Sequence, residues 1–133
     1  QGEISIGQLI RTALRMRPNR IIVGEVRGSE AADMLHALNT GHPGSLCTGH
    51  ANSCEEMLNR LTTMVLAGTS LPFEAVMRQI ETGIDVLIHI SRDSGGRRMI
   101  DEIAEVAKER KEHFNLIKIF TYKEGEGLVQ ETE

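Results

Sequence analysis

Residues 20–28 carry the first group of side chains whose types and spacing could do chemistry. Residues 21–23 form an apolar β-branched run, which is typical of a strand buried on both faces of a parallel sheet. Gly24 and Glu25 follow, so we expect a carboxylate at the carboxyl edge of the strand, where open α/β sheets bind ligands. There Glu25 could hold a magnesium-bound water or orient an attacking water in phosphoryl transfer. The alternative is a buried strand that ends in an ordinary salt bridge.

A second group lies between residues 42 and 54. Cys47, His50 and Cys54 are closely spaced, with His42 nearby, and a Cys-x-x-His pattern can ligate zinc. However, Cys54 falls at the start of a predicted helix, and free cysteines are often simply buried. A zinc site is therefore a rival interpretation of this segment.

Four helices must position these groups. Helical spacing of apolar residues predicts helices that start at Ser5, Ser29 and Ser53 and after Pro72. Ser5 with Gln8, and Ser53 with Glu56, stand at capping-box spacing. Gly68 is expected to cap the third helix at its C-terminus. The last helix is expected to bury Phe73, Val76, Met77 and Ile80.

The strands alternate with these helices, which indicates an α/β fold. We expect strands near residues 20–26, 45–50 and 85–90 to be central and largely parallel. Gly49 should let another group approach the backbone of its strand closely. Residues 93–96 are typical of a hairpin turn that joins the strand near 85–90 to a strand near 97–106. A final strand is expected near 114–122, and these last two strands should extend the sheet at one side. Residues 108–112 are expected to form a charged loop, and residues 123–133 a frayed polar tail.

Composition narrows the class of protein. The 133 residues suffice for one domain with a core. A net charge of −4 and 3% aromatic residues do not favour a nucleic-acid-binding surface. No apolar run approaches the roughly 18 residues of a membrane span. Two cysteines fit a reducing compartment. Gln1 is not an initiator methionine, so we expect that the chain begins inside a longer protein or follows processing.

Three stretches in register carry a family resemblance. Residues 14–28, 41–45 and 47–53 together resemble the ATPases of type II and type IV secretion and pilus assembly, especially those of conjugation and tight-adherence pili. In that family an arginine-rich helix end, a Walker B strand and a "His box" follow in this order. The resemblance implies the C-terminal part of a RecA-like P-loop NTPase core, with a mostly parallel central sheet flanked by helices and a C-terminal antiparallel hairpin. It places this partial domain at residues 1–122.

The resemblance also implies roles for single residues. Glu25 matches the Walker B acid, acting on Mg²⁺ through water or on the attacking water, and His50 matches the histidine that contacts the γ-phosphate. Arg27 follows the acid in the family pattern, where it could couple subunits. Arg15 and Arg17 match basic positions that can reach a nucleotide on a neighbouring subunit.

Physical chemistry agrees with these roles but allows others. A histidine can donate a hydrogen bond to a phosphate oxygen, and a guanidinium can pair with phosphate through two parallel bonds. Alternatively, His50 is a core histidine, and Arg15 and Arg17 are solvated charges that complement a helix dipole. His42 could touch the site or stabilise its own turn. We expect the carboxylates of residues 33, 55, 56 and 102 to be solvated.

One departure from the family pattern is decisive for activity. The phosphate-binding sequence G-x-x-x-x-G-K-[ST] is absent from these residues, and the family places it upstream. Without its amides and lysine most of the phosphate cradle is missing. We therefore expect weak ATP binding and negligible hydrolysis by this chain alone.

For the whole protein, the resemblance implies an ATP- and Mg²⁺-dependent homohexameric ring in the cytoplasm, at the inner face of the cell membrane. It would work with inner-membrane secretion or pilus components to move protein or DNA. The alternative is a ring or interaction module without nucleotide turnover.

Overall fold

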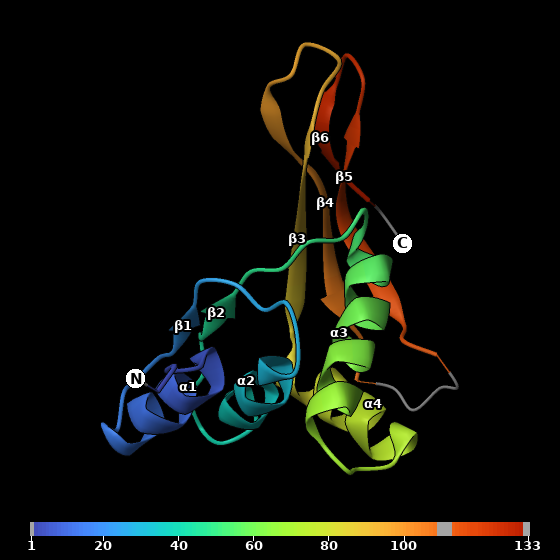
Figure 1. Cartoon of the computed structure of the whole chain (residues 1–133). Coiled ribbons are helices and arrows are strands. Elements are labelled where there is room, and N and C mark those ends of the chain that lie inside the picture. Colours follow the sequence, from blue (N-terminus) through green and yellow to red (C-terminus); the bar gives the residue numbers. More distant parts are fainter. Residues whose placement is uncertain (1, 109–112, 132–133) are drawn as a thin grey trace.

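The computed structural model of the chain describes residues 2–108 and 113–131 and confirms the α/β class (Figure 1). Helices and strands alternate up to residue 68, a further helix follows at residues 73–83, and the elements described from residue 86 onward are strands. The elements are α1 (Ile6–Arg15), β1 (Ile22–Val23), α2 (Glu30–Leu38), β2 (Leu46–Cys47), α3 (Cys54–Gly68), α4 (Phe73–Gly83), β3 (Val86–Arg92), β4 (Arg98–Val106), β5 (Leu116–Lys123) and β6 (Gly127–Gln130).

The strands form two separate sheets in the described part of the chain. β1 and β2 pair in parallel, with Ile22 opposite Leu46. β3, β4, β5 and β6 pair in that order, each antiparallel to the next. The expectation that residues 85–90 join the parallel strands is therefore wrong. The tight turn after β3 brings β4 straight back along it, with Arg92 opposite Arg98, and this local pairing sets the direction of the second sheet.

Helix starts follow the sequence signals in part. Ser5 and Gln8 form a full capping box at α1. Ser53 accepts a hydrogen bond from the Glu56 N–H at α3, but the Glu56 carboxylate turns to Asn52 instead of completing a box. Ser29 stands at the N-cap position of α2, where the sequence predicted the helix to start, but its side chain makes no cap hydrogen bond.

The core lies where α2, α3 and α4 pack against one another. Leu35, Leu58, Val76 and Ile80 are fully buried there. Each such side chain stabilises the fold by about 1.5–3 kcal/mol relative to exposure. Phe73 was expected to join this core, but half of its surface is exposed because it begins α4 on the solvent side.

Apolar surface remains open on both sheets. Ile22 and Leu46 are 74% and 63% exposed, and alternate residues of β3, Val86, Ile88 and Ile90, are at least half exposed. α3 lies on the opposite face of the long sheet (Figure 1). The apolar sequences of these strands are therefore typical of burial on both faces. In the described part of the chain, however, only one face of each sheet is covered.

The C-terminal segment is more ordered than its composition suggested. β5 runs to Lys123, and β6 pairs with it, so that Leu128 lies opposite Tyr122. The expected frayed tail is wrong for residues 127–130, because two glycines with positive φ, Gly125 and Gly127, allow the chain to reverse. Residues 109–112 of the expected charged loop, and residues 132–133, lie outside the described residues.

Length and hydropathy decide whether a helix in the described part of the chain can span a membrane. None of the helices there is both long enough and apolar enough to cross a bilayer.

A close helix contact at Gly68 yields a test of this packing. Gly68 ends α3, and a Cβ at this position would overlap the carbonyl oxygen of Ser29. We expect Gly68→Ala to lower the free energy of unfolding by about 1–3 kcal/mol through overpacking, which exceeds the helix-propensity gain of up to about 1 kcal/mol. Chemical denaturation measures the difference. Gly2→Ala is the control, since a Cβ there meets nothing within 4 Å; equal stability of both variants would contradict the contact.

Candidate functional site

Backbone pairing between β1 and β2 builds the site. The Val26 N–H donates to the Thr48 carbonyl over 3.0 Å, and the Thr48 hydroxyl donates to the Gly24 carbonyl. The two segments are therefore tied on both sides of Glu25. His50 follows Thr48 by two residues, so the parallel register brings it beside Glu25.

Two cationic or potentially cationic groups contact the Glu25 carboxylate. Arg27 Nη2 lies 2.7 Å from Glu25 Oε2, and His50 Nε2 lies 2.6 Å from Oε1. The Glu25 side chain is 25% exposed, whereas Arg27 and His50 are largely exposed. The sequence analysis placed all three residues in one site, and the structure brings them together.

Arg27 has the largest influence on the pKa of Glu25. Its hydrogen bond to Glu25 is the main reason why the pKa of Glu25 lies below its ordinary value, and burial opposes the shift while His50 adds to it. The same contact raises the pKa of Arg27. Glu25 is thus a stable carboxylate, able to accept hydrogen bonds but with no proton to donate.

One oxygen of Glu25, Oε1, faces His50. It is buried, and His50 Nε2 lies 2.6 Å from it. The contact with His50 is one of the causes that lower the pKa of Glu25. The imidazole and the guanidinium of Arg27 therefore each contact a different oxygen of the carboxylate.

The segment that carries His50 is fixed at its far end. Glu56 Oε2 accepts hydrogen bonds from the backbone and side-chain nitrogens of Asn52, over 3.2 Å and 2.8 Å. A Cβ at Gly49 would meet the end of the Met57 side chain, so the close approach expected at Gly49 comes from α3. His50 therefore projects from a short segment anchored on both sides.

The remaining candidates lie outside this contact group. Arg15 is exposed in the last turn of α1, and Arg17 follows with a φ of 52°. His42 Nδ1 donates to the Ala37 carbonyl over 3.1 Å, which stabilises the turn after α2. Within residues 2–108 and 113–131, no ion pair links Arg15 or Arg17 to Glu25. Their roles toward a nucleotide stay predictions.

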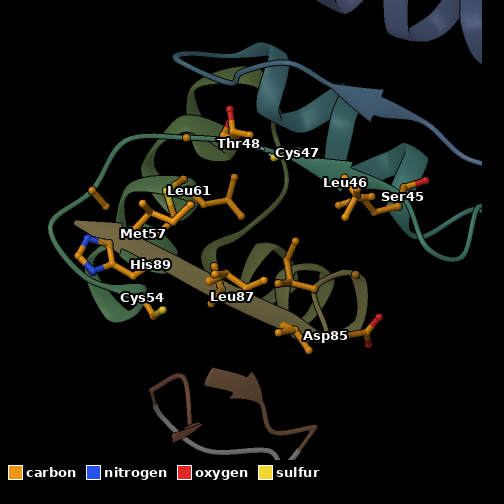
Figure 2. Close-up of a pocket in the computed structure, with 18 of the residues that line it drawn as sticks. Ser45, Leu46, Cys47, Thr48, Cys54, Met57, Leu61, Asp85, Leu87 and His89 are labelled. Carbon is orange, nitrogen blue, oxygen red and sulfur yellow. Dashed lines mark hydrogen bonds between the residues drawn. The ribbon is translucent and has the colours of Figure 1, made fainter. Parts of the chain in front are cut away.

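A hollow of about 540 Å³ lies beside the site, between β2, α3 and β3. Figure 2 shows Leu87 of β3 and Met57 and Leu61 of α3 among the side chains that line it. His50 contributes to its wall, but Glu25 does not. The lining is mostly apolar, so this hollow suits packing of apolar groups rather than charged phosphates.

Glu102 is the polar residue that the sequence analysis misjudged. It was expected to be solvated, but it is 8% exposed, accepts a hydrogen bond from the Cys54 N–H and lies 3.4 Å from Lys118 Nζ. The helix N-terminus and the ammonium together offset its burial. The sequence could have predicted this burial, because Glu102 lies two and four residues before the buried Ala104 and Val106, and alternate residues of a strand share a face.

The zinc interpretation has no support in the described residues. No group of three or more His, Cys, Asp or Glu side chains is arranged there to hold a metal. Burial and the neighbouring Glu102 raise the pKa of Cys54 to about 12, so its thiol stays protonated. A protonated thiol is a poor metal ligand.

Comparison with known proteins now decides the family. The model of the family described as "Type II/IV secretion system protein" matches residues 1–119. The chain belongs to this family. A protein of Mycobacterium tuberculosis named for conjugal transfer is 48% identical over 103 residues, covering 77% of this chain and 29% of that protein. The type IV secretion system protein VirB11 of Brucella suis is 38% identical over 105 residues, covering 75% of this chain and 29% of that protein.

Solved structures agree on the fold. The crystal structure of the VirB11 ATPase from the Brucella suis type IV secretion system, in complex with sulphate, superposes with a TM-score of 0.72 at 37% identity. It covers 77% of this chain and 32% of that one. The ATPase DotB of Yersinia pseudotuberculosis shares the fold with a TM-score of 0.60 at 24% identity, covering 76% and 26%. The chain thus spans less than a third of the length of these secretion proteins.

The contact between Arg27 and Glu25 can be tested directly. We expect Arg27→Gln to raise the pKa of Glu25, because the guanidinium is the largest influence that lowers it. Carbon-13 NMR of the side-chain carboxyl, followed through an acid titration of the 133-residue chain, measures the change. Arg20→Gln removes an arginine that does not influence Glu25 and serves as the control. An unchanged Glu25 pKa in Arg27→Gln would show that the contact does not persist in solution.

Proposed function

We propose that this chain is the part of a secretion or pilus-assembly motor ATPase that supplies its Walker B acid and its phosphate-contacting histidine. In the full-length protein, phosphate-binding residues outside this chain complete the site, and ATP hydrolysis drives export, pilus assembly or DNA transfer. The observation that carries the proposal is the ionised Glu25 carboxylate that follows β1 and contacts His50. A carboxylate that orients a water beside a phosphate needs this charge and this place near a strand end.

Family membership supports the proposal independently. VirB11 of Brucella suis is described as an ATPase, and its crystals hold sulphate, an anion of the shape and charge class of phosphate. It is 38% identical over 105 residues, which cover 75% of this chain. The family model matches residues 1–119, a range that includes Glu25 and His50.

ATP and Mg²⁺ are the proposed cofactors. The ionised Glu25 carboxylate can accept a hydrogen bond from a water in the magnesium shell, since Mg²⁺ keeps several of its waters in such sites. When bound, the ion neutralises charge on the transferring phosphate. Glu25 holds and orients water, Arg27 keeps it ionised, and His50 donates toward a phosphate oxygen.

The whole protein is proposed to act as a homohexameric ring at the cytoplasmic face of the inner membrane, with secretion or pilus components as partners. Arg15 and Arg17 are exposed at the end of α1, and this position leaves their guanidinium groups open to a nucleotide on a neighbouring subunit. Arg27 has the same exposure and is proposed to couple subunits while it pairs with Glu25.

Glu25→Gln in the full-length motor tests the proposed acid. The amide keeps the size of the side chain but loses its charge, so we expect turnover to fall by about 10²-fold or more. ATP affinity should stay within a few-fold of wild type, because phosphate binding depends on other groups. Steady-state hydrolysis and equilibrium nucleotide binding measure the two effects.

Two controls frame this experiment. Glu105→Gln replaces an exposed glutamate on β4, away from the site, and should leave turnover unchanged. The 133-residue chain alone should hydrolyse ATP negligibly, because it lacks the phosphate-binding loop. Wild-type turnover in Glu25→Gln would remove Glu25 from its role, and rapid hydrolysis by the isolated chain would overturn the assignment of a partial site.

His50→Ala tests the second residue. We expect turnover to fall by about 10²-fold, as for loss of a donor that stabilises developing charge. Stability should change by less than about 0.5 kcal/mol, because the His50 side chain is 79% exposed and leaves no cavity. Hydrolysis rates and thermal unfolding give both values. His36→Ala, at an exposed position on α2, is the matched control, and equal rates in the two variants would assign His50 a structural role.

A further inference from the structure

Glu30 occupies an unusual position at the start of α2. Its side chain turns back toward the preceding loop instead of projecting into solvent. Oε1 accepts two backbone hydrogen bonds, from the Arg27 N–H over 2.7 Å and from the Gly28 N–H over 3.1 Å. One carboxylate oxygen thus holds two successive peptide groups of the loop that follows Glu25.

These bonds replace a cap that the helix lacks. Ser29 stands at the N-cap position with helical backbone angles and makes no side-chain bond there. The Arg27 and Gly28 amides lie outside the β1–β2 pairing, so Glu30 supplies their acceptor. The two amide bonds also hold the pKa of Glu30 below its ordinary value, with the bond from Arg27 as the largest cause.

Two glycines, Gly28 and Gly68, allow close contacts on either side of the loop between Val26 and α2. A Cβ at Gly28 would stand 3.2 Å from Glu30 Oε2, tighter than an ordinary contact, so glycine leaves room for the returning carboxylate. Gly68, at the end of α3, lets the Ser29 carbonyl approach closely. The path between Val26 and α2 is therefore fixed by a hydrogen-bonded acceptor on one side and by a helix end on the other.

The direction of the Arg27 side chain depends on the backbone path between Val26 and α2. Its amide is held by Glu30, while its guanidinium lies 2.7 Å from Glu25 Oε2. Because the side chain is 76% exposed, packing does little to fix its direction, and the backbone must do so. The guanidinium pairs with Glu25, whereas Glu30 binds the backbone of the same residue.

We propose that Glu30 is a positioning residue of the site, which fixes the Arg27 backbone so that the guanidinium reaches Glu25. Its importance for turnover rests on the proposed function, but the contact itself does not. Glu30 acts through the reach of its oxygen rather than through its charge. Two variants separate these properties: Glu30→Gln keeps an acceptor oxygen at the same reach without the charge, and Glu30→Asp keeps the charge but shortens the reach.

NMR of the 133-residue chain, without nucleotide or metal, detects the contact between the Arg27 guanidinium and Glu25. A guanidinium held by a carboxylate rotates slowly and gives separate signals for its terminal nitrogens, while a released one gives averaged signals. We expect separate Arg27 signals in wild type and Glu30→Gln, and averaged signals in Glu30→Asp. Glu25→Gln provides the reference for a released guanidinium. Both variants are compatible with the first turn of a helix.

Every other pattern overturns the proposal. Release in Glu30→Gln with retention in Glu30→Asp would assign the effect to charge. Release in both variants would show that the charge of Glu30 is needed as well as its reach. Release in neither would show that the pairing does not depend on Glu30. Thermal unfolding of both variants confirms that the comparison is made on folded protein.

The full-length motor supplies a separate readout. Glu30→Asp should lower kcat by up to about 10²-fold, the cost of a small misplacement of a working group. KM for ATP should remain near wild type, and Glu30→Gln should retain most of the rate. If the full-length protein proves not to hydrolyse ATP, the proposed function fails, while the NMR result still decides the role of Glu30.

Discussion

The parallel pairing of β1 with β2 is the constraint on which the rest of the site depends. Two residues of each strand face one another, and the bond from Val26 to Thr48 extends the pairing beyond Glu25. Without this pairing, the segments that carry Glu25 and His50, 25 positions apart in the sequence, would have no reason to meet. Once it forms, a short anchored segment places the imidazole against the carboxylate. A small ladder of backbone bonds thereby sets the distance between these two side chains.

The carboxylates of this chain show how location decides what a charge does. Glu25 stands just beyond a strand end, where its two oxygens contact Arg27 and His50. Glu30 and Glu102 use their oxygens on backbone N–H groups at the starts of α2 and α3. Because the unpaired amides at helix starts favour negative charge, each of these two carboxylates stabilises a junction between elements. The site is thus supported by acids that take no part in its chemistry.

Each of the two sheets has one face that exposes apolar side chains. α3 covers one face of the long antiparallel sheet, and the other face exposes aliphatic side chains on β3. The hollow between β2 and β3 is also mostly apolar (Figure 2). Exposed apolar surface of this kind is typical of surfaces that contact other polypeptide. It agrees with a chain that spans less than a third of the length of its secretion-system relatives.

The sequence by itself determined the α/β class, the helix starts at Ser5 and Ser53, and the carboxylate of Glu25 directly after a strand. These features depend on local patterns of spacing, caps and strand ends, whereas the grouping of Glu25 with Arg27 and His50 followed from the family resemblance. Only the tertiary structure decided the separation of β3 from the parallel strands, the burial of Glu102 and the backward turn of Glu30. Each of these depends on which groups need a partner once the elements pack together, and local patterns do not encode that need. The same reason explains why apolar runs indicated burial on both faces while the fold of this chain covers one.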